Sequence, residues 1–232
     1  HDRVYGFYDQ GLCSQAEYVA VSVKKAVLRM PENVSYQQAA ASLEGAHYAY
    51  YFLNELGLKP GDNVLVNGGT GAIGNAALQF LKHYGVSVTI TCETDYVGIL
   101  KTQGADRVID YTKSDFTKIG EQFDYVFDAV GKSTFAKCKP LLKPKGIYIS
   151  SELGPYWQNI WFALLSPAMR DKKVKFPLPG SIHQSLKFID GLVASGQFKP
   201  LIDKTYKLDE IQHAYKYVLS GQKKGNVILT FD

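Results

Sequence analysis

The sequence predicts an α/β fold built on a doubly wound parallel sheet. Between residues 63 and 150, short apolar stretches alternate with stretches of helical periodicity. The short stretches are nearly all apolar, as expected of strands covered by helices on both faces. A glycine-rich segment, Gly69 to Gly74, joins the first of these strands to the first helix. Strands separated by helices imply crossover connections, and hence a parallel sheet.

The N-terminal part precedes this pattern and differs from it. Residues 4–23 carry aromatic and β-branched residues between glycines, which predicts short antiparallel strands. Residues 35–56 are rich in Ala and Leu and contain no proline, and Ser35 stands at a helix N-cap position. We therefore expect one or two helices that end at Gly57, followed by a turn at Lys59 to Asp62.

The periodicity of the central part predicts its elements in order. We expect strands at residues 63–67, 86–92, 107–110, 125–129 and 146–150. We expect helices at residues 73–84 and 96–103, near residue 116 and at 134–142. The first of these helices has apolar residues at the spacing i, i+3, i+4, i+7 of one buried face, namely Ala77, Phe80, Leu81 and Tyr84.

The C-terminal part returns to mixed structure. Residues 174–179 form a candidate edge strand, because prolines cannot take part in central strand pairing. An amphipathic helix follows, capped by Ser181 and ended by Gly196. Two strands, at residues 202–206 and 226–231, flank a helix at 209–219.

Composition narrows the possible functions. The 232 residues are 46% hydrophobic and 21% charged, which is enough to bury a core. The net charge of +4 is spread along the chain, so we expect no nucleic-acid partner. The most apolar run, residues 159–169, is too short to cross a bilayer, so we expect no membrane partner. Cys13, Cys92 and Cys138 lie far apart, which argues against zinc and disulfides and favours a cytoplasmic location.

Gly69, Gly71 and Gly74 form the motif G-x-G-x-x-G between a predicted strand and a predicted helix. The first glycine permits a tight turn, the second lets the backbone approach a pyrophosphate, and the third lets helix and strand pack closely. N–H groups at the start of the helix, together with the helix dipole, attract phosphates. We therefore expect a bound dinucleotide, with a tight turn that binds nothing as the alternative.

Glu93 stands at the end of the second strand of this pattern. An acidic side chain there accepts hydrogen bonds from the adenosine ribose and repels a 2′-phosphate, which favours NAD over NADP. The alternative is a solvated loop glutamate.

Five segments then follow one another in order: "PGDNVLVNGGTGAIGNAALQFLKHYG", "TQGADRVIDY", "FDYVFDAVGKSTF", "LLKPKGIYIS" and "LVASGQFKPLIDKTYKLDEIQHAYKYVLSGQKKGNVIL". With them the chain resembles the medium-chain dehydrogenase/reductase superfamily, in particular its zinc-independent quinone oxidoreductase branch. The resemblance implies a Rossmann domain and a GroES-like catalytic domain, with hydride transfer in the cleft between them. It also implies that an N-terminal part of the catalytic domain is missing.

The resemblance divides the chain into three parts. Residues 1–42 correspond to a partial GroES-like catalytic domain, and residues 43–172 to the Rossmann domain that binds NAD(P). Residues 173–232 correspond to an edge strand, a helix and the return to the catalytic domain.

The resemblance also implies which residues contact the cofactor. Thr70, Gly71, Ala72 and Ile73, between Gly69 and Gly74, match the loop that contacts the pyrophosphate. Tyr111 matches a tyrosine that lies near the adenosine 2′-phosphate in NADPH-dependent relatives. The remaining matches are Val130 and Gly131 over the adenosine and ribose, Ser150 and Ser151 beside the nicotinamide, and Lys224 and Asn226 where the last strand returns towards the cofactor.

The choice between NADH and NADPH stays open. Relatives place other residues at the positions of Glu93 and Tyr96, and these departures, with Asp95, weaken an NADPH assignment. Tyr111 favours NADPH. Additional positive charge is available from Lys101 and Arg107.

These features predict an NAD(P)H-dependent oxidoreductase that transfers hydride to a quinone or an α,β-unsaturated carbonyl. The alternatives are a zinc-dependent alcohol dehydrogenase and a non-catalytic NAD(P)-binding structural or regulatory dimer. No catalytic residue and no metal ligand is assigned, although Glu44 and His47 form a neighbouring acid–base pair. The histidines on predicted helices are expected to be structural. We expect a homodimer through the edge strand, and a lid and dimer contact at residues 155–169.

Overall fold

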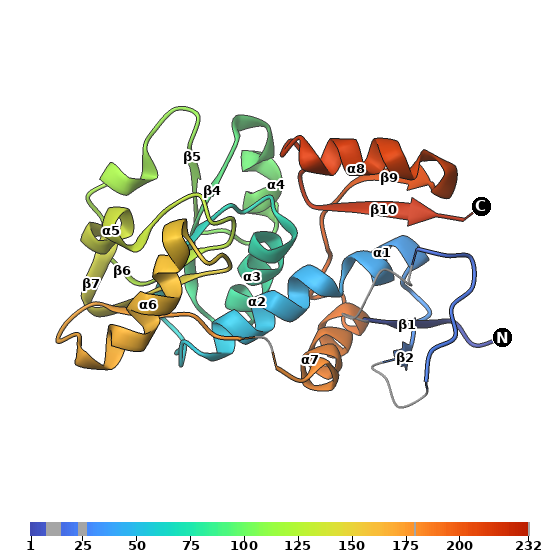
Figure 1. Ribbon diagram of the computed structural model, residues 1–232, viewed down its shortest axis with the longest axis horizontal. Helices are drawn as coiled ribbons and strands as arrows, with labels where there is room; N and C mark the ends of the chain where they lie inside the picture. The colour runs from blue at the N-terminus through green and yellow to red at the C-terminus, as the bar shows by residue number, and fades with distance from the viewer. Residues whose placement is uncertain (8–14, 23–26, 179, 232) are drawn as a thin grey trace. The chain divides into compact units, whose positions relative to one another are not determined.

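The computed structural model describes residues 1–7, 15–22, 27–178 and 180–231, and Figure 1 labels most of its helices and strands. The chain divides into two compact units. One unit runs from Tyr48 to Pro179, and the other combines His1–His47 with Gly180–Asp232. The assignment of the terminal segments to a GroES-like catalytic domain stays a prediction. Cys13 and Pro179 lie outside the described residues.

The larger unit contains a six-stranded sheet with the order β5-β4-β3-β6-β7-β8, in which all neighbours are parallel. Its strands are β3 (Asn63–Asn67), β4 (Ser87–Cys92), β5 (Arg107–Asp110), β6 (Phe123–Asp128), β7 (Leu142–Ser150) and β8 (Lys173–Lys175). The chain first adds strands on one side of β3 and then on the other. The order therefore reverses between β3 and β6, where doubly wound sheets bind ligands. The predicted fold class is confirmed.

Helices precede β3 and fill the connections between these strands. The α-helices are α2 (Glu44–Asn54), α3 (Ala72–His83), α4 (Val97–Thr102), α5 (Phe135–Cys138) and α6 (Gln158–Leu165). Short 3-10 helices are η1 (Thr94–Tyr96), η2 (Phe116–Lys118), η3 (Lys139–Leu141), η4 (Pro155–Trp157) and η5 (Ser166–Ala168).

Side chains are buried on both faces of the sheet. On one face, Val126 of β6 and Tyr148 of β7 belong to one core cluster, and the ring of Phe135 from α5 lies 6.0 Å from that of Tyr148. Phe127 follows Val126 and so points to the opposite face. There its ring stacks on Phe52 of α2, with 5.6 Å between the ring centroids. This double burial explains why the strands read as continuous apolar runs.

The other unit contains two small sheets. Strands β1 (Val4–Gly6) and β2 (Val27–Arg29) are antiparallel. Strand β1 lies in the predicted 4–23 strand region, whereas β2 follows it, and part of that region lies outside the described residues. Strands β9 (Ile202–Lys207) and β10 (Asn226–Thr230) are parallel. The helices are α1 (Tyr36–Ala41), α7 (Ile182–Ala194), η6 (Leu208–Glu210) and α8 (Ile211–Leu219).

Ser35 caps α1 as predicted. Its Oγ accepts a hydrogen bond from Gln38 N at 3.2 Å, and Gln38 Oε1 accepts one from Ser35 N at 3.1 Å. The two bonds form a capping box, which satisfies N–H groups that the helix leaves without partners. Ser181 takes the N-cap position of α7, but its side chain makes no capping hydrogen bond.

Strand β7 and helix α6 differ from their predictions in ways that have a physical reason. Strand β7 begins at Leu142 rather than at residue 146, because the pairing with β6 continues past an irregularity in the register. Helix α6 was expected only as an apolar segment. Its sequence, QNIWFALL, has apolar residues on every side, so no helical periodicity marks it.

Candidate functional site

Most of the predicted site residues lie at one edge of the parallel sheet. In the register, Asn67 pairs with Asp128 and Asp128 with Ser150. Val66 pairs with Ile90, and Cys92 with Asp110, so the carboxyl ends of five strands are aligned. The predicted residues end or follow these strands: Gly69, Thr70, Gly71, Ala72, Ile73 and Gly74 after β3, Glu93 after β4, Tyr111 after β5, Val130 and Gly131 after β6, and Ser150 and Ser151 at β7. The structure therefore brings these residues to one edge.

The first and third glycines of the motif are required by packing. A Cβ atom on Gly74 would lie 2.1 Å from the carbonyl oxygen of Gly68, so α3 approaches the turn too closely for any side chain. A Cβ atom on Gly69 would lie 2.5 Å from Cγ1 of Ile90 in β4. Both glycines therefore serve the fold itself.

The second glycine is not required by packing. A Cβ atom on Gly71 would lie 3.5 Å from Gly68 O and 3.6 Å from Val130 Cγ1, which are ordinary contacts, and its φ of −70° suits any residue. Gly71 is the N-cap of α3, whose first N–H groups precede the first helical bond, from Asn75 N to Gly71 O. The position that a Cβ would fill thus lies beside backbone donors and the positive end of a helix dipole, which fits a pyrophosphate.

The carboxyl group of Asp128 lies beneath this edge and is fully buried. It accepts hydrogen bonds from Asn67 Nδ2 at 3.0 Å, from Ser133 N at 2.8 Å and from Tyr148 OH at 3.3 Å. Burial and the nearby Asp128 raise the pKa of Tyr148 well above its ordinary value, so its hydroxyl remains a donor. One side chain thus connects β3, β7 and the loop after β6.

Thr91 extends this network to the glycine turn. Its Oγ1 donates to Asn67 Oδ1 at 2.8 Å and accepts from Gly68 N at 2.9 Å. The backbone of Gly69 donates to Thr91 O at 2.8 Å. The start of the turn is therefore fixed to both β3 and β4.

Glu93 and Tyr111, which the sequence singled out separately, are hydrogen-bonded to each other. Tyr111 OH donates to Glu93 Oε1 at 2.6 Å. Burial and this hydrogen bond raise the pKa of Tyr111 above its ordinary value. Arg107, considered as a source of positive charge, begins β5 and pairs with Glu121. It is three residues from Asp110, or about 10 Å along the strand, on the side away from the site.

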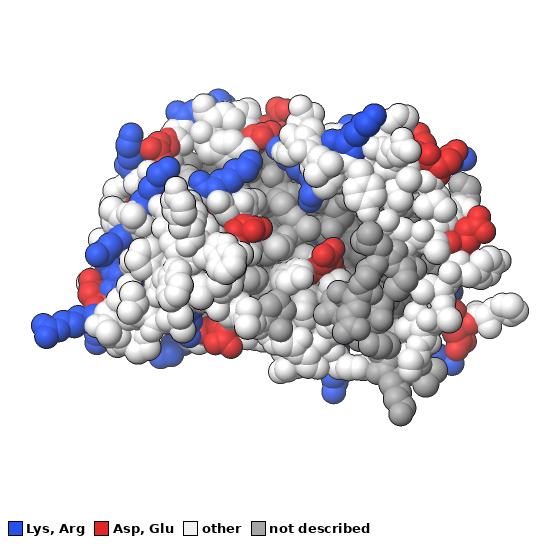
Figure 2. Space-filling model, viewed as in Figure 1, with Lys and Arg blue, Asp and Glu red and all other residues white. Residues whose placement is uncertain are grey.

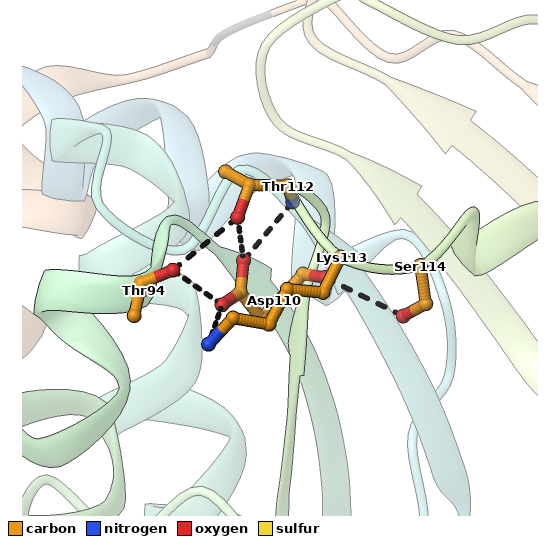
Figure 3. Close-up of polar contacts among 5 residues, drawn as sticks. All are labelled: Thr94, Asp110, Thr112, Lys113 and Ser114. Carbon is orange, nitrogen blue, oxygen red and sulfur yellow. Dashed lines mark hydrogen bonds and ion pairs between the residues drawn. The ribbon is translucent and has the colours of Figure 1, made fainter.

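Asp110 holds together the two segments that carry this pair, as Figure 3 shows. Its Oδ2 accepts from Thr94 Oγ1 at 2.5 Å, and its Oδ1 accepts from Thr112 N at 3.0 Å and Thr112 Oγ1 at 2.6 Å. Lys113 Nζ lies 3.1 Å from Oδ2. The hydroxyl of Thr112, then that of Thr94, hold the pKa of Asp110 well below its usual range. Since Thr94 follows Glu93 and Thr112 follows Tyr111, the cluster fixes the pair in place.

Sequence reasoning missed this cluster, although Thr94, Asp110 and Thr112 each stand beside Glu93 or Tyr111. The available signal was a carboxylate at a strand end with hydroxyl residues after two neighbouring strands. Only the register between β4 and β5 shows that these side chains meet.

The segments after β6 and β7 also pack together. Gly131 has a φ of +63°, and a Cβ atom on it would lie 2.3 Å from Cγ of Glu152. Ser150 Oγ accepts from Glu152 N at 3.2 Å, and Ser151 N donates to Asp128 O at 3.0 Å. These contacts hold Ser150 and Ser151 at the same edge as the glycine turn.

Lys224 and Asn226 belong to the other unit. There Lys224 N donates to Asp203 Oδ2 at 2.7 Å, and Asn226 Nδ2 donates to Leu201 O at 3.0 Å. Their contact with the cofactor stays a prediction. His47 is buried with its Nδ1 2.7 Å from Ser185 Oγ, as expected of a structural histidine, whereas Glu44 is exposed.

The described part of the chain contains no group of three or more His, Cys, Asp or Glu residues that could hold a metal ion. Cys92 and Cys138 are buried, and burial raises the pKa of each thiol to about 11. No helix in the described ranges is both long and apolar enough to cross a membrane.

A family model described as "Zinc-binding dehydrogenase" matches residues 103–229. The chain belongs to this family. It is 32% identical over 98% of its length to a 2-methylene-furan-3-one reductase of Solanum lycopersicum, and 28% identical over 93% to a chloroplastic NADPH-dependent alkenal/one oxidoreductase of Arabidopsis thaliana. It covers 57% and 52% of these relatives. A quinone oxidoreductase structure from Coxiella burnetii superposes with a TM-score of 0.78 at 24% identity, over 89% of this chain and 64% of that one.

Family membership confirms the resemblance to medium-chain dehydrogenases/reductases of the quinone oxidoreductase type. The family description also names zinc, but the described residues of this member do not form a ligand set for it.

We expect Gly74→Ala to destabilise the fold and Gly71→Ala to leave it intact. The new methyl group overlaps Gly68 O in the first variant, at a cost of about 1–3 kcal/mol for an overpacked site, and makes only ordinary contacts in the second. Urea unfolding of both variants against wild type measures the difference. Equal loss of stability in the two variants would contradict the geometry.

We expect Asp110→Asn to be less stable than wild type at pH 7, with a difference that narrows steadily in acid. A carboxyl group whose pKa is lowered by folding stabilises the protein above its unfolded pKa, about 3.9, and this contribution is lost as the pH falls through the folded value. Urea unfolding at a series of pH values from 7 to 2 measures the difference. A difference independent of pH would show that the carboxylate charge is not responsible.

Proposed function

We propose that this protein is an NAD(P)H-dependent reductase that transfers hydride to a quinone or an α,β-unsaturated carbonyl. The observation that carries the proposal is Gly71, a glycine where the fold leaves room for a side chain, at the N-terminus of α3. The printed names of the relatives, a furanone reductase and an alkenal/one oxidoreductase, support the substrate class.

Each part of the edge would have one task. The first N–H groups of α3 would hold the pyrophosphate. Glu93 would accept hydrogen bonds from the adenosine ribose, and Val130, which packs on Gly68, would cover it. The segment at Ser150 and Ser151 would hold the nicotinamide end. The bound cofactor supplies the hydride, and the protein contributes orientation and exclusion of water.

We propose further that NADH is preferred to NADPH. Glu93 and the Asp110 cluster place carboxylates at the ends of β4 and β5, where a 2′-phosphate would be repelled. The hydroxyl of Tyr111, the residue that favoured NADPH, already donates to Glu93. Arg107 pairs with Glu121 at the other end of β5.

The proposal predicts NADH oxidation at 340 nm by the full chain in the presence of a benzoquinone or an alkenone, with a lower KM for NADH than for NADPH. Glu93→Gln keeps the shape of the side chain and removes its charge. The preference for NADH over NADPH should therefore fall about tenfold, which is the effect expected from removing one nearby charge. Glu55→Gln, at an exposed glutamate of the same unit that precedes β3, is the matched control and should change little.

Three other results would each contradict part of the proposal. Binding of both nucleotides without reduction of either acceptor would indicate a non-catalytic binding protein. Activity that a chelator abolishes and zinc restores would indicate a zinc-dependent alcohol dehydrogenase. A preference unchanged in Glu93→Gln would remove Glu93 from nucleotide selection.

We also propose that the protein is a homodimer, with β8 pairing across a two-fold axis. Strand β8 is an edge strand, and α6 packs beside it with exposed Trp161, Leu164 and Leu165. Figure 2 shows the uncharged surface in this region. Unpaired edges and exposed apolar side chains are commonly covered by a partner. The cytoplasmic location stays a prediction from the sequence.

Light scattering of the full chain at micromolar concentration should give the mass of a dimer, and Leu164→Glu should shift it towards the monomer. Tyr36→Glu, at an exposed aromatic residue of the other unit, is the control and should leave the mass unchanged. A clean monomer of the wild-type chain would refute the dimer.

A further inference from the structure

Three buried polar atoms that follow β7 have no hydrogen-bond partner among the described residues. They are Ser151 Oγ, Gln158 Nε2 and Asn159 Oδ1. Buried polar groups in proteins are nearly always paired, because leaving one unpaired forfeits the hydrogen bonds that it makes with water. Three such atoms within nine residues indicate a place where a polar ligand completes the hydrogen bonding.

The amide of Asn159 is held in a fixed orientation. The residue is 1% exposed, its Nδ2 donates to Glu152 O at 2.8 Å, and its backbone N donates to Leu153 O at 3.1 Å. The donor side of the amide is therefore used by the protein, and its oxygen is left as an acceptor.

Gly154 brings the two amides against the same turn. Its φ is +71°, and a Cβ atom on it would lie 2.9 Å from Asn159 Nδ2 and 3.1 Å from Gln158 Cγ. The absence of a side chain at residue 154 therefore lets both side chains pack against the segment that begins at Ser151.

The backbone between the turn and α6 is strained. Tyr156 and Trp157 have φ values of 52° and 59°, in the left-handed region that is unfavourable for residues other than glycine. Such conformations persist where the surrounding structure imposes them, often at binding sites. Here they immediately precede Gln158 and Asn159, so the strained segment sets where these two amides lie.

We propose that Ser151, Gln158 and Asn159 hold the carboxamide group of the nicotinamide ring. A carboxamide carries one acceptor and two donors, so its oxygen can accept from Gln158 Nε2 and its N–H can donate to Asn159 Oδ1. The Ser151 hydroxyl can donate or accept. The inference rests on the proposed function, because it requires the dinucleotide to lie along the edge formed by the carboxyl ends of the strands. The amides would fix which face of the ring points to the substrate.

The test compares two ligands that share everything but the nicotinamide. Calorimetric titration of the full chain with NADH and with ADP-ribose is carried out for wild type, Gln158→Met and Asn159→Leu. Both variants keep the approximate size of the side chain and remove its hydrogen-bonding groups. We expect the Kd for NADH to rise about three- to tenfold, as for loss of one hydrogen bond, and the Kd for ADP-ribose to remain unchanged. Gln122→Met, at an exposed glutamine of the same unit, is the control.

Asn159 also supports the turn through Nδ2, so Asn159→Leu could lose stability, and Gln158→Met then carries the test alone. An unchanged Kd for NADH in Gln158→Met overturns this inference and leaves the proposed function standing. Equal weakening of NADH and ADP-ribose, or a higher KM for the quinone with an unchanged Kd for NADH, also overturns it. Failure of the wild type to bind either ligand overturns the proposed function and this inference together.

Discussion

The buried carboxyl group of Asp128 is the interaction on which the rest of the site depends. It accepts hydrogen bonds from β3, from β7 and from the loop after β6, without exposure to water. Through Asn67 and Thr91 the same network reaches Gly68, where the glycine turn begins. A turn that is fixed from below by its neighbours needs no ligand to take its shape. Its backbone donors are therefore already oriented before anything binds, which lowers the entropic cost of binding.

The two ends of this edge are stabilised in different ways. At β4 and β5, Asp110 with its hydroxyl partners holds Glu93 against Tyr111, and the local groups are largely satisfied by one another. At β7 the polar atoms of Gln158 and Asn159 are unsatisfied and the backbone beside them is strained. At β4 and β5, an acidic end whose polar groups are hydrogen-bonded to one another suits discrimination between similar ligands by charge. At β7, polar atoms without hydrogen-bond partners suit a ligand group that must be oriented on binding.

The sequence predicted the elements whose signals are local. The bounds of β3 and β5 agree with the structure because an apolar run between turn residues defines each of them. The sequence did not predict contacts between neighbouring strands, because the hydrogen bond from Thr94 to Asp110 depends on the register between β4 and β5. Glu93 and Tyr111 were interpreted as opposing signals, and only the structure shows that one hydrogen bond joins them. Asn159 was missed because α6 lacks the polar face that reveals an amphipathic helix.

The contrast between Gly71 and Gly74 has a consequence for the amount of protein in a cell. Chaperones and proteases recognise unfolded chains and are indifferent to whether a folded one binds its ligand. A change at Gly74, which the fold requires, would lower the abundance of the protein, and blotting or proteomics would detect it. A change at Gly71, which the fold tolerates, would leave a normal quantity of folded protein, and under the proposed function that protein would bind its dinucleotide poorly. The abundance of the protein therefore reveals damage at Gly74 but does not reveal damage at Gly71.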